Sequence, residues 1–458
     1  MDDLVQLAAD VGPVHEQVGC LLVLDGSSAD PAALADLLAD RLGSVPRFRQ
    51  VLTPAPFGCG PALWTDDPRS DPQRHVHVVP CPGAGDEPAM LLAARDATVA
   101  PLPTDRSPWR AVVLTGLCGG RVGVVLVVHH VLTDGIGGLA VLVVLADPAR
   151  REELDESTTG RHAPVWAPRP RPGSAAVARE VWAERLRAVP ALPRRVRMSA
   201  YALGEMRRLG RSRTSRCSLN VRTGPRRHVV VARADLSPLR AAAHAYDATV
   251  NDVVLAAVSG ALRHLVVRRG EPVPQMTASV PVSRRITTTT TDLGNSVGGM
   301  VVPLAVDVDR IDRLRRTAGT TRERKAVPSE SFEALVGPLF RLAARLHLVR
   351  AFVDHQRTVT TFVSDLAGPA VPISIGGSPV LEMLPVSHLT GNVTVTFAAL
   401  SYTGRLVVTV TADPDACPDL DELARLLQTE LDGYAALGTQ VTPVGRRPSP
   451  GRSSGTPQ

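Results

Sequence analysis

The sequence is poor in lysine and in aromatic side chains, and its cysteines lack metal-binding spacing. Lys325 is the only lysine among 458 residues, aromatic residues make up 3% of the chain, and the formal net charge is +6. No basic stretch is interleaved with aromatic residues that would stack on bases, so nucleic acid is not an expected partner. The positive charge is compatible instead with an anionic ligand or an anionic membrane surface.

The six cysteines lie far apart and show no C-x-x-C pair. This spacing is unlike a zinc ribbon or a disulfide scaffold, so we expect reduced thiols. The first residues, 1–4, have neither the basic nor the apolar region of a signal peptide. The apolar runs around residue 129 are too short to span a bilayer. We therefore expect a cytoplasmic protein, with peripheral attachment to the inner membrane face left open.

Changes of pattern along the chain indicate four parts. Strand-like and helix-like segments alternate over residues 1–150 and again over 217–440, and this alternation predicts two α/β halves. Residues 151–216 are rich in Pro and Arg and are interpreted as a crossover between the halves. Residues 441–458 consist mainly of Pro, Ser, Gly and Arg, a composition typical of a disordered tail.

Hydrophobic periodicity predicts the individual elements. Strand patterns span residues 17–25, 74–79, 110–114, 121–128, 228–232, 277–282, 300–306, 392–400 and 405–412. Helical patterns span residues 31–43, 135–147, 175–187 and 249–269, with a last helix built on Leu420, Leu423, Leu427 and Leu431. The turn at 401–404 predicts a hairpin between the last two strands.

One apolar strand ends in polar, titratable side chains. The Val- and Leu-rich run 124–128 is followed by His129, His130, Asp134 and Gly135. Burying an unpaired imidazole or carboxylate costs several kcal/mol, so this pattern favours a catalytic site over a packed core. On an extended strand His129 and His130 point to opposite faces, and only one of them can face a given channel.

The chain resembles the wax ester synthase/diacylglycerol acyltransferase family of O-acyltransferases, within the CoA-dependent acyltransferase superfamily. Residues 129–135 match the family's HHxxxDG motif, and residues 250–263 match its Asn-Asp helix. Further similar segments are 281–285, 294–295, 367–369 and 401–404, and the resemblance covers about Leu4 to Leu437. HHxxxDG also occurs in condensation domains of peptide synthetases, so the Asn-Asp helix is what narrows the resemblance to this family.

The resemblance implies an α/β fold of two chloramphenicol-acetyltransferase-like sandwich halves with an active-site tunnel between them. It implies transfer of a fatty acyl group from acyl-CoA to a long-chain alcohol or diacylglycerol, giving wax ester or triacylglycerol. Acyl-CoA would be a co-substrate, with no other cofactor, no metal and no covalent acyl-enzyme. The lipid products are compatible with a peripheral membrane or lipid-droplet surface.

Carry-over from the family's second histidine makes His130 the expected general base. An imidazole suits this role because its ordinary pKa, about 6.5, lies near working pH. His129 is expected to pack beneath its neighbour or to orient it. Asp134 could hold the imidazole or brace the loop through Arg284 or Arg285, and we favour bracing. Gly135 would let the backbone turn tightly.

Asn251 and Asp252 are expected at the start of their helix, facing the site across the two halves. Asn and Asp are also common helix caps. A capping or bracing role and a direct catalytic role therefore both stay open.

One residue departs from the family's pattern. Asp365 occupies the usual asparagine position of the SNVPGP segment, here 364–369. This replacement is the only support in the sequence for an alternative function, a catalytically lapsed lipid- or acyl-carrier-binding module on the same fold.

Two other chemistries compete with acyl transfer. Residues 294–298 fit G-x-S-x-G with Ser296 as nucleophile, but a nucleophile elbow needs a strand before the serine and a helix after it. A Thr-rich loop precedes Ser296 and a strand-like run follows, so a serine hydrolase is disfavoured. A metal site formed by His75, His77, His130 and Asp134 is less favoured still, because no second cluster has ligand spacing.

Overall fold

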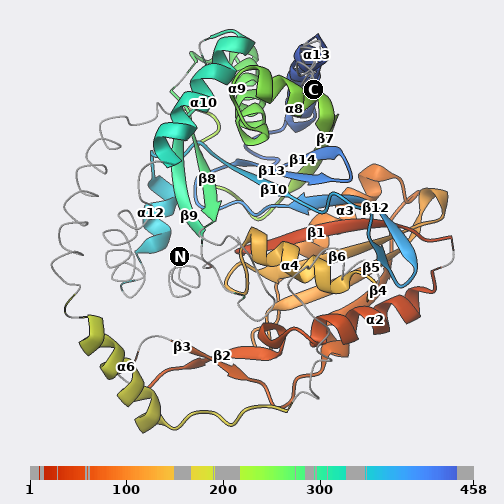
Figure 1. Ribbon diagram of the computed structural model, residues 1–458, viewed down its shortest axis with the longest axis vertical. Helices are drawn as coiled ribbons and strands as arrows, with labels where there is room; N and C mark the ends of the chain where they lie inside the picture. Colours follow the sequence, from red (N-terminus) through yellow and green to blue (C-terminus); the bar gives the residue numbers. More distant parts are fainter. Residues whose placement is uncertain are drawn as a thin grey trace, which may run out of the picture.

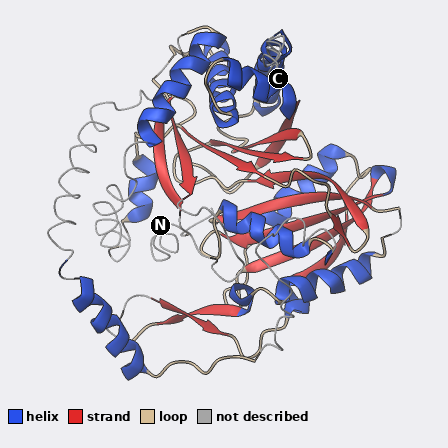
Figure 2. Cartoon of the chain, in the orientation of Figure 1, coloured by secondary structure: helices blue, strands red, loops and turns tan. Residues whose placement is uncertain are grey.

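The computed structural model describes residues 10, 15–27, 29–56, 59, 62–148, 167–188, 190, 217–273, 275–283, 293, 297–306, 308–325, 346 and 348–440. Within these residues the chain forms two six-stranded sheets with helices on their outer faces (Figures 1 and 2). A separate two-stranded sheet pairs β2 (Gln50–Pro54) with β3 (Ala62–Asp66).

The first sheet has the strand order β11-β12-β1-β6-β5-β4. Its strands are β1 (Gln17–Asp25), β4 (Val76–Pro80), β5 (Trp109–Leu117), β6 (Arg121–His129), β11 (Ser374–Ile375) and β12 (Ser378–Val386). Helices α2 (Pro31–Gly43) and α4 (Gly135–Leu145) share one apolar cluster with β1 and β6. Helix α3 (Glu87–Val99) packs against the opposite face of the same strands.

The second sheet has the order β7-β14-β13-β10-β8-β9. Its strands are β7 (His228–Asp235), β8 (Thr277–Ser283), β9 (Val297–Pro303), β10 (Thr361–Ala367), β13 (Val395–Tyr402) and β14 (Arg405–Ala412). One core cluster joins this sheet to α9 (Val250–Arg268) and to neighbouring helices. Those neighbours are α8 (Leu236–Ala245), α10 (Arg310–Lys325) and α13 (Leu420–Gln440), which Figure 1 shows on the outer side.

The shorter elements lie between these layers or at their margins. They are the 3-10 turns η1 (Pro46–Arg49), η2 (Pro72–His75) and η3 (Cys118–Gly120), and the helices α6 (Ser174–Ala188) and α12 (Val349–His355). Helix α9 is long and apolar enough to cross a membrane by composition, but 72% of that stretch is buried inside the protein. Burial of this extent is what a core helix of a globular domain shows.

The two halves are tied together by two strands that the C-terminal part of the chain contributes to the first sheet. β11 and β12 come from the C-terminal part of the chain, yet β12 pairs antiparallel with β1. Arg233 on β7 strengthens this tie, because its guanidinium contacts Glu382 on β12 at 2.6 Å and Glu87 on α3 at 2.5 Å. These carboxylates raise the pKa of Arg233, so its charge is held in place at the contact between the two halves.

Most predicted elements agree with the structure, and the departures have local causes. β1 has the predicted bounds, and Asp30 caps α2 by accepting the Ala32 N–H at 3.0 Å. The predicted hairpin forms, with positive φ at Thr403 (46°) and Gly404 (82°), as a two-residue type I′ turn requires. The strand expected at 74–79 starts only at Val76, because residues 72–75 form η2 instead.

Candidate active site

The end of β6 is held in place by the strands around it. β1 and β6 are antiparallel with Gln17 opposite His129, and the N–H of His130 donates to the carbonyl of Glu16 at 2.8 Å. The N–H of His129 donates to the carbonyl of Pro108 at 3.0 Å. The backbone of the two-histidine sequence is therefore fixed from both sides.

The ring of His129 is buried among hydrogen-bonding partners. Its Nδ1 accepts the N–H of Val131 at 3.1 Å, so Nε2 carries the proton and donates to the Asp10 carboxylate at 3.0 Å. Asp10 also accepts the N–H of Glu16 at 3.1 Å and contacts the ring of His15 at 3.2 Å. Burial acts to raise the pKa of Asp10, but these hydrogen bonds lower it overall. His129 thus anchors the strand end to the segment before β1.

The ring of His130 has a different environment. His130 is half-buried, and its ring meets the ring of His388 edge to face, with centroids 5.5 Å apart and planes at 87°. Burial and then the charge of His388 lower the pKa of His130 to about 4, whereas the Glu16 carboxylate acts to raise it. The ring is therefore neutral near pH 7 and can accept a proton.

Reasoning from the sequence did not place Glu16 and His388 beside His130. Glu16 is 9% exposed, and its carboxylate lies 3.9 Å from His388 Nε2 and 3.3 Å from the hydroxyl of Thr390. Burial raises the pKa of Glu16 and lowers that of His388 to about 4. In the sequence these residues are 372 positions apart, with no motif around either, so only the strand pairing brings them together.

Asp134 caps the helix that follows the histidines. It is 2% exposed, and its Oδ1 accepts the N–H of Gly137 at 2.8 Å as the N-cap of α4. A Cβ on Gly135 would lie 3.0 Å from Leu366 Cδ2, so β10 of the second sheet packs directly on this helix start. The expected bracing partners of Asp134, Arg284 and Arg285, lie outside the described residues.

Asp252 is part of a capping box at the start of α9. Its Oδ2 accepts the N–H and the hydroxyl of Thr249, each at 2.8 Å, and its N–H donates to the Thr249 hydroxyl at 3.3 Å. Its Oδ1 accepts the hydroxyl of Thr321 on α10 at 2.6 Å. These contacts favour capping and bracing over a direct catalytic role for Asp252. Asn251 is half-buried in the first turn of the same helix.

Asp365 is a half-buried carboxyl group on β10. Burial raises its pKa to about 6, and the charge of Lys325 at the end of α10 acts in the opposite direction. β10 pairs in parallel with β13, with Asp365 opposite Ala399. The departure from the family's pattern therefore places an ionisable group one residue from Leu366, which contacts the start of α4.

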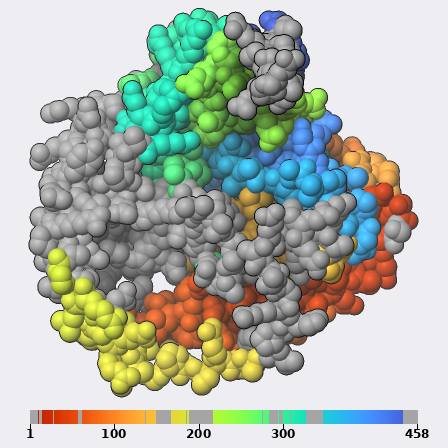
Figure 3. All heavy atoms as spheres, in the orientation of Figure 1, coloured from red at the N-terminus to blue at the C-terminus, as the bar shows by residue number. Residues whose placement is uncertain are grey.

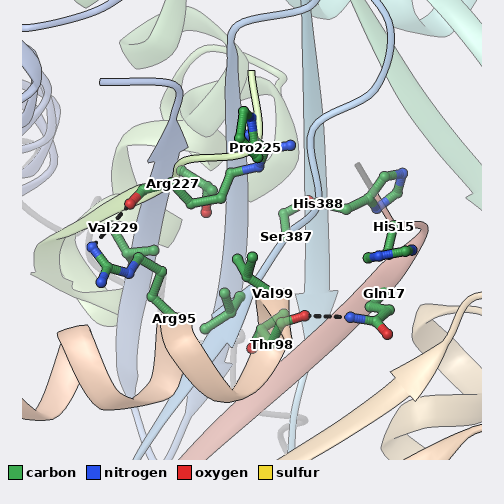
Figure 4. Close-up of a pocket in the computed structure, with 12 residues that line it drawn as sticks. His15, Gln17, Arg95, Thr98, Val99, Pro225, Arg227, Val229, Ser387 and His388 are labelled. Carbon is green, nitrogen blue, oxygen red and sulfur yellow. Dashed lines mark hydrogen bonds between the residues drawn. The ribbon is translucent and has the colours of Figure 1, made fainter. Parts of the chain in front are cut away.

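A small cavity lies between the two halves, and His15 and His388 are among the residues that line it. Its volume is about 20 Å³, enough for about one water molecule, within an open depression of about 370 Å³. Gln17, Arg95 and Thr98 line it from the first half, and Arg227, Val229 and His388 line it from the second (Figure 4). His388 both lines this cavity and contacts the ring of His130.

The two competing chemistries gain no support from the described residues. Ser296 lies outside them, and β9 begins at Val297, so a strand follows this serine instead of the helix of a nucleophile elbow. His75 is buried against Trp109, with ring centroids 4.3 Å apart, whereas His77 is exposed on β4. Among the residues that the structure describes, no group of three or more His, Cys, Asp or Glu could hold a metal ion.

Known proteins resemble this chain over most of its length. Residues 2–254 match the model of the wax ester synthase/diacylglycerol acyltransferase catalytic domain, and residues 293–434 match the WS/DGAT C-terminal domain. A Mycobacterium tuberculosis protein named as a diacylglycerol O-acyltransferase is 28% identical over 445 residues, which is 94% of this chain and 93% of that protein. A second M. tuberculosis protein with such a name is 25% identical over 423 residues, covering 92% of this chain and 86% of that one.

Solved structures show the same fold. The wax ester synthase/diacylglycerol acyltransferase from Marinobacter aquaeolei VT8 aligns with a TM-score of 0.66 at 20% identity, covering 95% of this chain and 98% of that one. The first condensation domain of the calcium-dependent antibiotic synthetase aligns with a TM-score of 0.59, also at 20% identity, covering 95% and 94%. Together with the family models, which match more than half of the sequence, these findings show that the chain belongs to the wax ester synthase/diacylglycerol acyltransferase family.

Proposed function

We propose that the protein transfers a fatty acyl group from acyl-CoA to the hydroxyl group of a long-chain alcohol or diacylglycerol, with His130 as the general base. The observation that carries this proposal is the position of His130, a half-buried neutral imidazole at the end of β6 whose ring contacts His388, a residue that lines the small cavity between the two halves. The names of the family and of the mycobacterial relatives support the substrate class.

The chemistry needs one group that can take up and release a proton. His130 removes the hydroxyl proton while the alcohol oxygen attacks the thioester carbonyl carbon. When the resulting tetrahedral intermediate collapses, the carbon–sulfur bond breaks, and the imidazolium returns the proton to the departing CoA thiolate. The products are an ester and free CoA. The reaction written in this way uses acyl-CoA as co-substrate and no further cofactor.

Replacement of His130 by alanine tests this proposal. A positioned general base contributes roughly 10²- to 10⁴-fold to the rate, so we expect a loss of that order in ester formation from labelled palmitoyl-CoA with hexadecanol or diacylglycerol. His244 is an exposed histidine on α8, and His244→Ala is the matched control that should keep its activity. Full turnover by a folded His130→Ala protein would refute the role of His130.

The same assay separates the enzyme from a catalytically lapsed binding module. A lapsed module would bind palmitoyl-CoA without forming ester, even in the unsubstituted protein. The imidazole of His130 is in place and neutral, and its backbone is fixed by β1. These features favour the enzyme, although Asp365 stands at the usual asparagine position.

We further propose that the protein works at a lipid surface, on the cytoplasmic face of the inner membrane or on a lipid droplet. Helix α6 exposes Trp182 (55%) and Leu186 (69%), which are four residues apart and therefore on one helix face. Arg179 and Arg187 are exposed on the same helix, which lies at the lower left margin of the molecule in Figure 3. Exposed aromatic and aliphatic side chains beside arginines suit the interface of an anionic lipid layer.

Sedimentation with lipid vesicles tests this second proposal. We expect the protein to bind vesicles of phosphatidylcholine and phosphatidylglycerol, and the double variant Trp182→Ser, Leu186→Ser to bind them less. Leu381→Ser is a matched control, since Leu381 is 51% exposed but lies on β12. Equal binding by all three proteins would contradict the assignment of α6 to the lipid surface.

A further inference from the structure

We propose that Glu16 and His388 act as a positioning pair that fixes the ring of His130 and sets its basicity. This inference rests on the proposed function of His130 as the general base. It adds two residues that the family motifs in this sequence do not include.

The topology of the first sheet brings the three side chains together. β1 is the middle strand of the set β12-β1-β6, and it pairs antiparallel with both neighbours. Glu16 precedes β1, His130 follows β6 and His388 comes two residues after the end of β12. Because both neighbours run against β1, their ends and the beginning of β1 meet at one edge of the sheet.

Contacts at this edge fix the backbone of His130 through Glu16 and its ring through His388. The carbonyl of Glu16 accepts the N–H of His130 at 2.8 Å, and the ring of His388 meets the ring of His130 at 87° with centroids 5.5 Å apart. The Glu16 carboxylate lies 3.9 Å from His388 Nε2, and the hydroxyl of Thr390 lies 3.3 Å from the same carboxyl group. His388 Nδ1 is buried and has no hydrogen-bond partner among the described residues.

Some of the charged groups around Glu16 and His388 favour protonation of the two histidines His130 and His388, and others disfavour it. A positive charge on His388 disfavours protonation of His130, and so does His129, whereas the carboxylate of Glu16 favours it. Arg227 and His129 disfavour protonation of His388, and Asp10, which also contacts His15, favours it. Burial of His130, His388 and Glu16 in one place strengthens each of these interactions.

Glu16 and His388 therefore have separate effects on the reaction. Burial keeps His130 unprotonated near pH 7, and a protonated His388 would lower the pKa of His130 further, while its ring fixes the plane of the His130 ring. Glu16 stabilises the imidazolium that forms when His130 takes the proton of the alcohol. His388 also lines the cavity between the two halves.

The pH dependence of kcat/KM tests the pair, because the two substitutions are expected to have opposite effects. His388→Gln removes a group that can become positive and keeps a polar side chain, so the acidic limb of the profile should move to higher pH. Glu16→Gln removes a negative charge, so the acidic limb should move to lower pH. Unit charges at these separations shift a neighbouring pKa by on the order of one unit. If Glu16 and His388 had a purely structural role, both substitutions would lower turnover at every pH and leave the acidic limb of the profile at the same pH.

A direct titration does not depend on activity. The ring resonances of His130 are identified by their absence in His130→Ala and are followed by NMR from acidic to neutral pH in the unsubstituted protein, His388→Gln and Glu16→Gln. Shifts of the His130 pKa in opposite directions in the two variants support the proposed positioning pair. An unchanged titration of His130 in both variants overturns the proposal. His244→Gln, on the exposed side of α8, is the control. If His130→Ala retains turnover, the proposed function fails, and the titration still decides whether the pair controls the basicity of His130.

Discussion

Replacing Asp252 by alanine should destabilise the second half of the protein. The side chain is 3% exposed and accepts three hydrogen bonds, two from Thr249 and one from Thr321. Hydrogen bonds to a charged group contribute about 1.5–3 kcal/mol each, and loss of a helix cap costs about 1 kcal/mol. The substitution also removes the cost of burying the carboxylate, so we expect a net loss of about 2–4 kcal/mol instead of the sum.

Thr321→Val is the matched variant from the other side of the contact. It removes one of the three hydrogen bonds while Thr249 still satisfies the carboxylate, so we expect a loss of about 1–2 kcal/mol. Because Asp252 and Thr321 contact each other, the double variant should be less destabilised than the sum of the single variants.

Urea unfolding, followed by circular dichroism, measures the free energies of unfolding, and ester formation is assayed well below the transition. We expect turnover to follow the folded fraction in all variants. An Asp252→Ala protein of unchanged stability and lost turnover would refute the capping interpretation and assign Asp252 to the reaction.

Other predictions concern a buried glycine and two kinds of titration. In Gly260→Ala the new Cβ would lie 2.1 Å from Arg313 Nη1 and 2.5 Å from Glu430 Cδ, against a buried ion pair. We expect a loss of about 2–4 kcal/mol in urea unfolding, whereas Gly319→Ala, with no atom within 4 Å of its new Cβ, should be neutral or stabilising. The pKa values of His130 and His388 are lowered to about 4, so the unfolded chain binds more protons between about pH 6.5 and 4. Stability should therefore decrease as the pH is lowered from about 6.5 to about 4, and less steeply in His388→Gln; identical slopes would contradict the assignment. Burial raises the pKa of Asp365 from 3.8 to about 6, so its ionisation lowers stability as the pH rises through that window. Asp365→Asn should therefore stabilise the protein by about 1–2 kcal/mol at pH 8 and by less at pH 4, and a gain that is equal at both values would argue against a buried charge.

The sequence predicts the individual helices and strands of this fold better than it predicts which strands pair with one another. β1 and the β13–β14 hairpin follow from alternation and turn residues, and the helical stripe of α9 follows from its period. The pairing of β12 with β1 joins segments more than 350 residues apart. Nothing in the sequence of either strand indicates which strand it pairs with. The 3-10 turn before β4 was also missed, because burial of His75 against Trp109 overrides the local alternation.

The same contrast between local and distant residues applies to the active site. The family motif gives His129, His130 and Asp134, because all three lie within six residues of one strand end. The structure gives these residues different environments through distant partners: Asp10 for His129, and Glu16 and His388 for His130. A motif specifies which side chains are available, but the basicity of an imidazole depends on the charges and the burial around it. The acidic limb of the pH profile of this enzyme should therefore be governed by residues outside its HHxxxDG motif, namely Glu16 just before β1 and His388 just after β12.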